Sequence, residues 1–168
     1  EFDEIEILFE GAQGFGLDVD WGDYPFVTSS HCTVGSAILN GVPPKSIRDI
    51  WGVAKIYETY VGAKHFADND EIFDKIREVG NEYGATTGRP RQINWLDFDL
   101  LKMAIDINGV NKLVINKMDV LKELNIWRIF EGLNMFEFVA EDDIKYWISD
   151  SLKDRSLEIM FSGNKHAI

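Results

Sequence analysis

Cysteine, long apolar runs and basic residues are scarce in this sequence. Cys32 is the only cysteine among 168 residues, which excludes an internal disulfide and a cysteine-rich zinc site within the chain. We expect Cys32 to be a small buried apolar residue. No apolar run approaches the roughly 20 residues that a membrane-spanning helix needs, and the start lacks the pattern of a signal peptide. We therefore expect a cytoplasmic protein without a membrane partner.

The charge balance restricts the partners of the chain. Lysine and arginine number 17 against 29 acidic residues, which gives a formal net charge of −12. A field of that sign repels polyanions and argues against nucleic acid as a partner. A phosphate ligand would have to be held by a local basic cluster.

Apolar residues, in contrast, are plentiful. They make up 45% of the chain, and charged residues 27%, which is typical of one soluble globular domain. Because the chain opens with Glu1 rather than methionine, we expect residues 1–168 to be either a single domain or the C-terminal portion of a larger single-domain protein.

The first 20 residues predict strands and a glycine-rich loop. Residues 5–9 form a short apolar run, which we interpret as a buried strand, and residues 17–20 alternate as a strand does. This order does not fit a dinucleotide-binding loop, which leads into a helix. We expect Asp18 and Asp20 to form a polar face or loop anchors rather than a metal pair, because no histidine or further carboxylate has suitable spacing.

The rest of the chain alternates between strand and helix patterns, which predicts an α/β fold with a mostly parallel sheet and flanking helices. A capping box at Asp68 and Glu71 precedes one helix, which Gly80 ends. Another carries an apolar stripe of Leu96, Leu100, Met103 and Ala104. In chain order we predict a helix over 36–40 stopped by Gly41, a strand over 50–61, the capped helix, a helix over 96–108 stopped by Gly109, a strand over 112–116 and a helix over 142–151.

Residues 84–91, here called the arginine loop, place Arg89 and Arg91 on a segment that glycine and proline keep from being helical. Guanidinium groups match the geometry of carboxylates and phosphates. The loop is therefore either an anion clamp or an ordinary solvated turn. Further polar candidates are the amide of Gln13, held among glycines, and the hydroxyl cluster that begins at Thr28. For His31 a polar surface position is preferred to a role as a base.

Asn116, Lys117 and Asp119 follow a short apolar run that reads as a strand. Ligands of doubly wound sheets bind outside the carboxyl ends of strands. Asn-Lys-x-Asp is also the pattern with which many GTP-binding proteins read guanine, because an ionised aspartate accepts hydrogen bonds from the ring N1–H and the exocyclic amine. A guanine-nucleotide switch that rests on these residues alone is a further, weaker reading.

Taken together, six blocks of the chain resemble the adenylosuccinate synthetases in order and spacing. The blocks are residues 9–14, 24–30, 61–63, 82–89, 95–97 and 117–121. The resemblance implies the later portion of a P-loop-NTPase-like guanine-nucleotide ligase fold, incomplete at its N-terminus. It also implies a cytoplasmic homodimer that joins L-aspartate to IMP, driven by GTP, through 6-phosphoryl-IMP in purine biosynthesis.

Carried over to this sequence, the resemblance implies three groups of binding residues. Gln13 would contact the C6 oxygen of IMP, and Arg91 would face both aspartate and GTP. The groups are Gln13, Thr28, Val61 and Arg89 for IMP; Ala85, Thr86, Thr87, Gly88, Arg89 and Arg91 for aspartate; and Arg91, Lys117, Met118, Asp119, Ser162 and Gly163 for GTP.

The sequence also departs from the family pattern. Tyr60 replaces an arginine, residues 63–68 replace the usual continuation, and Gln92 and Asn94 replace an arginine and a glycine. These changes leave open a viral-type relative that uses dGMP to make 2-amino-2'-deoxyadenylosuccinate.

The family's catalytic aspartate and histidine, its phosphate-loop lysine and its Mg²⁺ ligands belong to an earlier segment, and no G-x-x-x-x-G-K-[ST] motif occurs in residues 1–168. We therefore expect no metal ligands in this chain and no turnover by it alone. A non-catalytic nucleotide-binding half of a split protein is the alternative.

Overall fold

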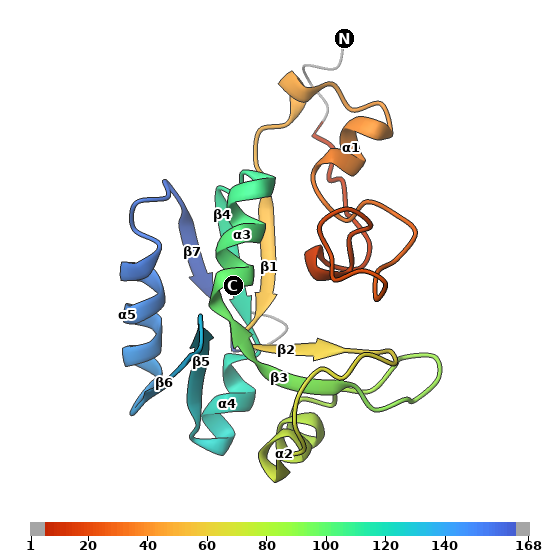
Figure 1. Cartoon of the computed structure of the whole chain (residues 1–168). Coiled ribbons are helices and arrows are strands. Elements are labelled where there is room, and N and C mark those ends of the chain that lie inside the picture. Colours follow the sequence, from red (N-terminus) through yellow and green to blue (C-terminus); the bar gives the residue numbers. More distant parts are fainter. Residues whose placement is uncertain (1–5, 164–168) are drawn as a thin grey trace. The chain divides into compact units, whose positions relative to one another are not determined.

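The computed structural model describes residues 6–163. The chain divides into two compact units, Glu1–Arg48 and Asp49–Ile168, and each unit is treated by itself (Figure 1). Among the described residues, no helix combines the length and the apolar character that crossing a membrane requires.

The first unit consists of loops and short helices. Its elements are the 3-10 helices η1 (Phe15–Leu17) and η2 (Pro44–Ser46) and the helix α1 (Gly35–Leu39). The predicted short helix over 36–40 is thus confirmed. Gly41 follows it with φ of 90°, a conformation that glycine adopts without strain.

Two strand predictions for this unit are wrong. Residue 5 lies outside the described residues, residues 6–10 adopt no regular structure, and none of the described strands pairs with them. Ile7 and Leu8 are 73% and 87% exposed, so an apolar run without a pairing strand does not make a strand. Residues 17–20 form a turn, because the backbone N–H groups of Asp20 and Trp21 donate to the Asp18 carboxylate and compete with strand pairing.

The second unit contains two sheets. Strands β1 (Trp51–Lys55), β4 (Lys112–Asn116) and β7 (Glu158–Phe161) form a parallel sheet with β4 in the middle. The order in the other sheet is β2 (Tyr57–Tyr60), β3 (Gln92–Asp97), β5 (Trp127–Glu131) and β6 (Asn134–Phe138). In that sheet only β3 and β5 run parallel. The α/β prediction with a parallel sheet is confirmed, and the mixed second sheet is an addition to it.

The predicted single strand over 50–61 is wrong, because it is two strands in different sheets. β1 pairs with β4 and β2 pairs with β3. The break falls at Ile56, which is fully buried and whose N–H donates to Asn116 O at 3.0 Å. Periodicity could not reveal a change of sheet within one apolar run.

Four helices belong to this unit: α2 (Glu71–Val79), α3 (Phe98–Asn108), α4 (Met118–Leu124) and α5 (Glu141–Ser151). α2 ends at Gly80 as predicted, but its N-cap is Asp70, which accepts from Ile72 N, rather than Asp68. The predicted capping box of Asp68 and Glu71 is therefore wrong, because Glu71 is the first residue of the helix. α5 confirms the prediction for residues 142–151.

The predicted apolar stripe of α3 is also wrong. The helix begins at Phe98. Its N-cap is Asp97, whose side chain accepts a hydrogen bond from Leu100 N at 3.0 Å, and Leu96 belongs to β3. Its buried face consists of Phe98, Leu101 and Ile105, whereas Met103 is 39% exposed. Gly109 ends the helix in the left-handed conformation, as expected.

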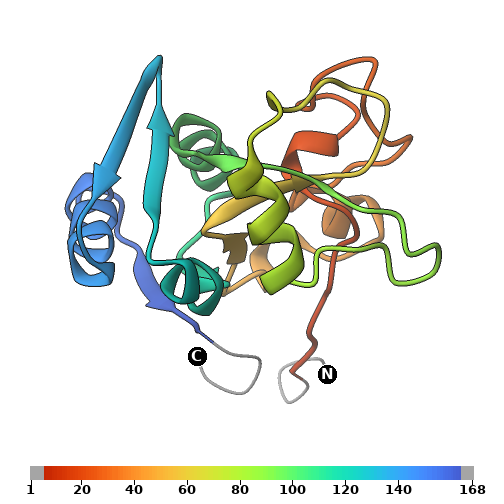
Figure 2. The same cartoon turned by 90° about the horizontal axis from the view of Figure 1, so that it is seen from below.

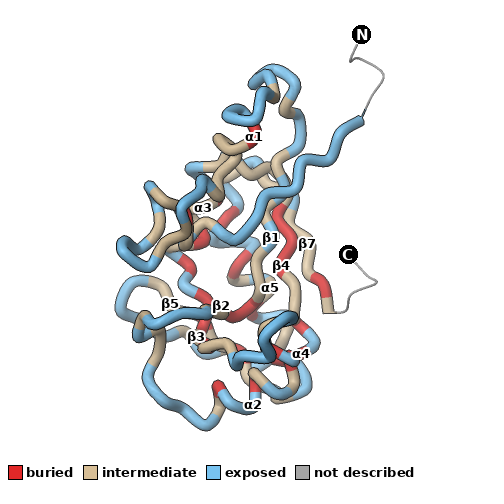
Figure 3. Tube along the Cα trace, turned by 90° about the vertical axis from the view of Figure 1, so that its right-hand side faces the viewer, coloured by how far each residue is buried: buried red, intermediate tan, exposed pale blue. Residues whose placement is uncertain are grey.

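The core of the second unit lies between its sheets and helices, and β4 is its most buried strand (Figure 3). The β5–β6 hairpin, which ends the second sheet, lies beside α5 (Figure 2). Trp147 of α5 fills that contact, with ring centroids 4.7 Å from Phe98 and 5.2 Å from Phe136. Burying a large apolar side chain contributes about 1.5 to 3 kcal/mol, so this packing helps to hold α5 against the β5–β6 hairpin.

Candidate functional site

The carboxyl ends of β4 and β7 bring five of the predicted GTP-binding residues together. Lys117 follows β4 with φ of 64°, and α4 begins at the next residue. Met118 N donates to Ser162 O at 3.2 Å, and Ser162 N donates to Ile115 O at 2.9 Å. The residues gathered here are Lys117, Met118, Asp119, Ser162 and Gly163.

Within this group the side chains divide between core and surface. Met118 is 2% exposed and Ser162 6% exposed, so both serve packing, whereas Asp119 is exposed. A Cβ atom on Gly163 would lie 3.7 Å from Asp119 N, so the chain after β7 runs close beside Asp119. Asn116 Oδ1 is buried and has no hydrogen-bond partner among the described residues. A ligand that donates to it would recover part of the cost of an unpaired acceptor, about 1 to 3 kcal/mol.

Glu82 joins this strand edge to the arginine loop. Its side chain is 2% exposed, and its carboxylate accepts from Lys55 Nζ at 2.8 Å, Tyr57 OH at 2.8 Å and Arg91 Nη1 at 2.9 Å. Lys117 Nζ lies 3.9 Å from Glu82 Oε1 and donates to Gly80 O at 2.8 Å. Arg91 and Lys117, both predicted to bind GTP, thus share one buried carboxylate.

The electrostatics of this group favour an anionic ligand. Burial raises the pKa of Glu82, but the hydrogen bonds from Lys55 and Tyr57 outweigh it and hold that pKa below its ordinary value. Burial also lowers the pKa of Lys55, and the nearby charges of Arg91 and Lys117 act in the same direction. Three cations therefore surround one carboxylate, which is a locally positive spot on a chain of net charge −12.

The arginine loop is a compact exposed turn. Gly84 N donates to Arg89 O and Gly88 N donates to Gly84 O, each at 2.8 Å, and Gly88 takes φ of 62°. At its base Tyr83 forms a bridge with Pro90. The predicted aspartate-binding residues Ala85, Thr86, Thr87, Gly88 and Arg89 are all exposed on it.

Val61, predicted to line the IMP ribose, follows β2 and is 53% exposed. The departures from the family pattern are gathered beside it. Gln92 Nε2 donates to Gly62 O at 3.0 Å and to Lys64 O at 2.9 Å, and Asn94 Nδ2 donates to Phe66 O at 3.1 Å. The changed residues of β3 therefore hold the changed loop that follows β2.

Gln13 and Thr28, the other predicted IMP-binding residues, belong to the first unit. Gln13 is exposed with φ of 60°, which is an uncommon conformation for a residue with a side chain. Thr28 is half-buried and its N–H donates to Leu17 O at 2.8 Å.

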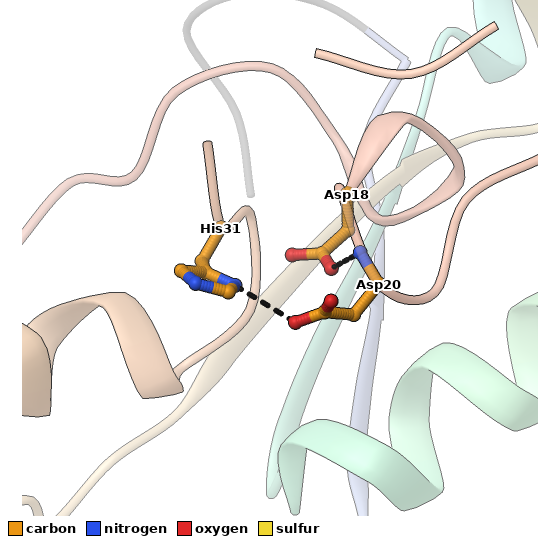
Figure 4. A group of neighbouring side chains, drawn as sticks. All are labelled: Asp18, Asp20 and His31. Atoms are coloured by element: carbon orange, nitrogen blue, oxygen red, sulfur yellow. Dashed lines mark hydrogen bonds and ion pairs between the residues drawn. The ribbon is translucent and has the colours of Figure 1, made fainter. Parts of the chain in front are cut away.

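Asp18, Asp20 and His31 also meet in the first unit (Figure 4). His31 Nδ1 lies 3.3 Å from Asp20 Oδ2, so the expectation that no histidine approaches the aspartates is wrong. Asp18 is fully buried and accepts from the N–H groups of Asp20, Trp21 and Cys32, which confirms it as a loop anchor. Burial raises the pKa of Asp18, but these backbone hydrogen bonds outweigh it and keep that pKa below its ordinary value.

This trio does not fit Mg²⁺, which demands octahedral oxygen coordination. One of its three donors is an imidazole nitrogen, and backbone N–H groups already occupy both oxygens of Asp18. It is also the one group of three metal-ligating side chains among residues 6–163.

A cleft of about 320 Å³ lies between the loop after β2 and the start of α3. Glu58 lines it together with Lys64, Asn94 and Asp97, and its carboxylate accepts from Asp97 N at 3.3 Å. Burial raises the pKa of Glu58 to about 7.

Sequence reasoning missed Lys55, Tyr57 and Glu82 as members of the site. Glu82 stands in one of the blocks that carry the family resemblance, yet no role was given to it. Lys55 and Tyr57 lie on either side of Ile56, where the chain changes sheets. A lysine that ends a run of strand residues was the available signal, because lysine is rarely buried without a partner.

Comparisons with known proteins show the family to which the chain belongs. A model of the family described as adenylosuccinate synthetase matches residues 2–147. The adenylosuccinate synthetase of Leuconostoc citreum is 47% identical over 145 residues, which cover 81% of this chain and 34% of the relative. That of Geobacillus kaustophilus is 38% identical over 181 residues, covering 96% and 42%. The chain thus spans about a third to two fifths of the length of these curated relatives.

Solved structures give the same picture of the fold. Fully ligated adenylosuccinate synthetase from Plasmodium falciparum superposes with a TM-score of 0.81 at 28% identity, covering 92% of this chain and 47% of that one. Succinoaminodeoxyadenylate synthetase of cyanophage S-2L, bound to dGMP and dATP, gives a TM-score of 0.53 at 19% identity, covering 84% and 48%. At that identity the second likeness concerns the fold alone.

Proposed function

We infer that this chain, which belongs to the adenylosuccinate synthetase family, carries the base-reading and aspartate-binding part of a ligase. The reaction is the joining of L-aspartate to C6 of IMP, coupled to the hydrolysis of GTP, in purine nucleotide biosynthesis. We further propose that the ligase is a cytoplasmic homodimer and that residues 1–168 are the later portion of its single large domain.

One observation carries this proposal: Arg91, Lys117, Asp119 and Gly163, which are far apart in the sequence, meet at one strand edge around Glu82. The exposed Asp119 carboxylate can accept two hydrogen bonds from the N1–H and the exocyclic amine of guanine. Adenine presents no such pair of donors. The stem of Lys117 can lie along the base, next to the point where its ammonium group donates to Gly80 O.

For the nucleophile, we propose that the arginine loop receives L-aspartate. Arg89 pairs with a carboxylate, and Thr86 and Thr87 supply hydroxyl donors from the same exposed turn. Gly88 in the left-handed conformation keeps the turn tight, so its backbone can approach the ligand. Because a charge-assisted pair typically contributes about 1.5 to 3 kcal/mol, Arg89 would dominate aspartate binding.

For the electrophile, we propose that Gln13, Thr28, Val61 and Arg89 contact IMP. The side-chain amide of Gln13, placed beside the C6 oxygen of IMP, would stabilise the charge that develops on that oxygen. The departures at Tyr60, Gln92 and Asn94 lie beside Val61, and they are the observation that keeps dGMP as an alternative substrate.

Phosphoryl transfer needs a metal ion, a phosphate cradle and a positioned base together. The residues around Glu82 would supply recognition of the guanine ring and positive charge. The group of Asp18, Asp20 and His31 does not fit Mg²⁺. We therefore propose that GTP is used as its Mg²⁺ complex and that the groups which hold this metal ion and activate IMP are not among residues 6–163.

Isothermal titration of the 168-residue chain with GMP, AMP, IMP and dGMP tests the proposal. We expect GMP to bind more tightly than AMP, and we expect Asp119→Asn to remove that preference. Asp142→Asn, which changes an exposed aspartate at the start of α5, is the matched control. Equal affinity for GMP and AMP in the unaltered chain would contradict guanine reading. The IMP and dGMP arms, run in Asp119→Asn so that dGMP is not held by the guanine-reading residues, decide between the two purine substrates.

A further inference from the structure

Glu82 stands where two parts of the proposed site meet. It lies between Gly80, which accepts from Lys117 Nζ at 2.8 Å, and the arginine loop. Its backbone closes the base of that loop, because Arg91 N donates to Glu82 O at 3.0 Å. The same residue therefore contacts the loop through its backbone and its side chain.

The two carboxylate oxygens of Glu82 face different partners. Oε2 accepts from Lys55 Nζ and Arg91 Nη1, whereas Oε1 accepts from Tyr57 OH and has Lys117 Nζ 3.9 Å away. Lys55 and Tyr57 hold the carboxylate from the β1–β2 side. Arg91 and Lys117 are 32% and 36% exposed, so these two are the partners that a ligand can reach.

The charges in this group are not balanced. Three cations surround Glu82, and their like charges repel one another, since, besides burial, Arg91 and Lys117 both lower the pKa of Lys55. The contact of Lys117 is the longest of the ion pairs at 3.9 Å, so it has the most room to change.

From this geometry we propose that Glu82 is a positioning residue that couples the guanine-reading segment Lys117–Asp119 to the arginine loop. A guanine base on Lys117 changes the contact of Lys117 with Glu82, and this shifts Arg91 and the loop that it closes. The inference rests on the proposed function, since it assigns guanine to Lys117 and Asp119. By linkage, a ligand on the arginine loop must affect guanine binding to the same degree.

This coupling is tested by titrating the ¹⁵N-labelled 168-residue chain with GMP in nuclear magnetic resonance. The method still detects binding with a dissociation constant on the order of millimolar. We expect GMP to shift the amide signals of Lys117–Asp119 and also those of residues 85–89. In Glu82→Gln the first shifts remain, and those of the loop fall by about fivefold or more. Glu78→Gln, a change to an exposed glutamate of α2, should behave as the unaltered chain.

The outcomes separate the coupling from the proposed function. No GMP shifts at Lys117–Asp119 in the unaltered chain would overturn the guanine site, and the coupling with it. Base-site shifts without loop shifts in the unaltered chain, or loop shifts that persist in Glu82→Gln, would overturn the coupling alone.

A second variant keeps the test valid if Glu82→Gln does not fold. Arg91→Gln changes a side chain that is 32% exposed and leaves Glu82 paired with Lys55 and Tyr57. Because Arg91 is itself a proposed GTP contact, the variant is compared at saturating GMP. There we expect the shifts at Lys117–Asp119 to be seen and those at residues 85–89 to be lost. Loop shifts of unchanged size in this variant would equally overturn the coupling.

Discussion

Asp18 organises the loops of the first unit through one buried carboxylate. It accepts hydrogen bonds from three backbone N–H groups, and two of the donors, Asp20 and Cys32, are 12 residues apart in the sequence. In Asp18→Asn, an NH2 group replaces one carboxylate oxygen, so a donor faces a backbone N–H donor. We expect the free energy of unfolding of this unit to fall by about 2 to 3 kcal/mol.

Amide hydrogen exchange at Trp21 and Cys32 measures this loss locally, and urea unfolding measures it globally. Asp20→Asn is the control, because the Asp20 side chain is exposed and should cost no more than about 0.5 kcal/mol. Equal effects of the two changes would show that Asp18 is not the anchor.

Glu58 gives the second unit a pH-dependent stability. Burial raises its pKa from an ordinary 4.5 to about 7, so the folded chain holds the proton more tightly than the unfolded chain. The contribution is fully present below about pH 4.5 and is lost as the pH rises through about 7, by at most about 2 to 3 kcal/mol. Urea unfolding at a series of pH values measures this slope.

Glu58→Gln should flatten that slope, since its amide oxygen can still accept from Asp97 N and carries no charge. Glu78→Gln, at an exposed position, should leave the slope as it is. A slope of the same size in Glu58→Gln would assign the pH dependence to other groups.

At this scale the sequence predicted the residues whose chemistry is local. The pattern of Lys117 and Asp119 could be recognised because it is contiguous and follows a strand, and its role in guanine binding stays a prediction. Asp18 was expected to be a loop anchor or part of a polar face, and its three backbone hydrogen bonds confirm the anchor. Glu82, Lys55 and Tyr57 could not, because their roles arise only when β1, β2 and the arginine loop meet. His31 likewise reaches Asp20 through a fold that spacing does not reveal.

The elements show which sequence signals decide structure. Glycines that follow helices and strong helix patterns placed α2, α5 and the end of α3 to within a residue or two, although only Gly109 is left-handed among these helix ends. Apolar runs were less informative: residues 50–61 are divided between two sheets, and residues 6–10 form no strand. An apolar run indicates that a segment can be buried. Whether the segment forms a strand depends on a neighbouring strand with which it can pair.

Gly80 shows how the end of an element sets up the site. Its φ of −74° suits any residue, but a Cβ atom there would lie 2.5 Å from Tyr57 OH and 2.8 Å from Ile76 O. Gly80→Ala should therefore displace Tyr57 from Glu82 and destabilise the chain by about 1 to 3 kcal/mol. Urea unfolding measures the loss, and the ultraviolet absorbance of the tyrosines reports the changed hydroxyl environment.

Gly14→Ala is the matched control for that change. Its φ is −158° and a Cβ atom there meets nothing within 4 Å, so we expect stability to change by less than about 0.5 kcal/mol. Full stability in Gly80→Ala would show that Tyr57 can move without cost.

At the scale of the whole molecule, recognition and reaction are separate properties. The second unit carries the proposed guanine-reading residues, the arginine loop and the cluster of cations around Glu82. The chain covers 34% to 42% of the length of the curated relatives cited above. Phosphoryl transfer requires a metal ion, a phosphate cradle and a positioned catalytic base together, and we propose that these groups lie outside residues 6–163.

We therefore expect the 168-residue chain to bind guanine nucleotide and L-aspartate without joining aspartate to IMP. Phosphate release and adenylosuccinate formation, measured with IMP, MgGTP and aspartate, should not exceed the rate without protein. L-Aspartate binding, measured by titration, should weaken by about 10- to 150-fold in Arg89→Leu and stay unchanged in Lys153→Leu, an exposed control. Turnover by the chain alone would refute this separation, and aspartate affinity that survives Arg89→Leu would remove the arginine loop from substrate binding.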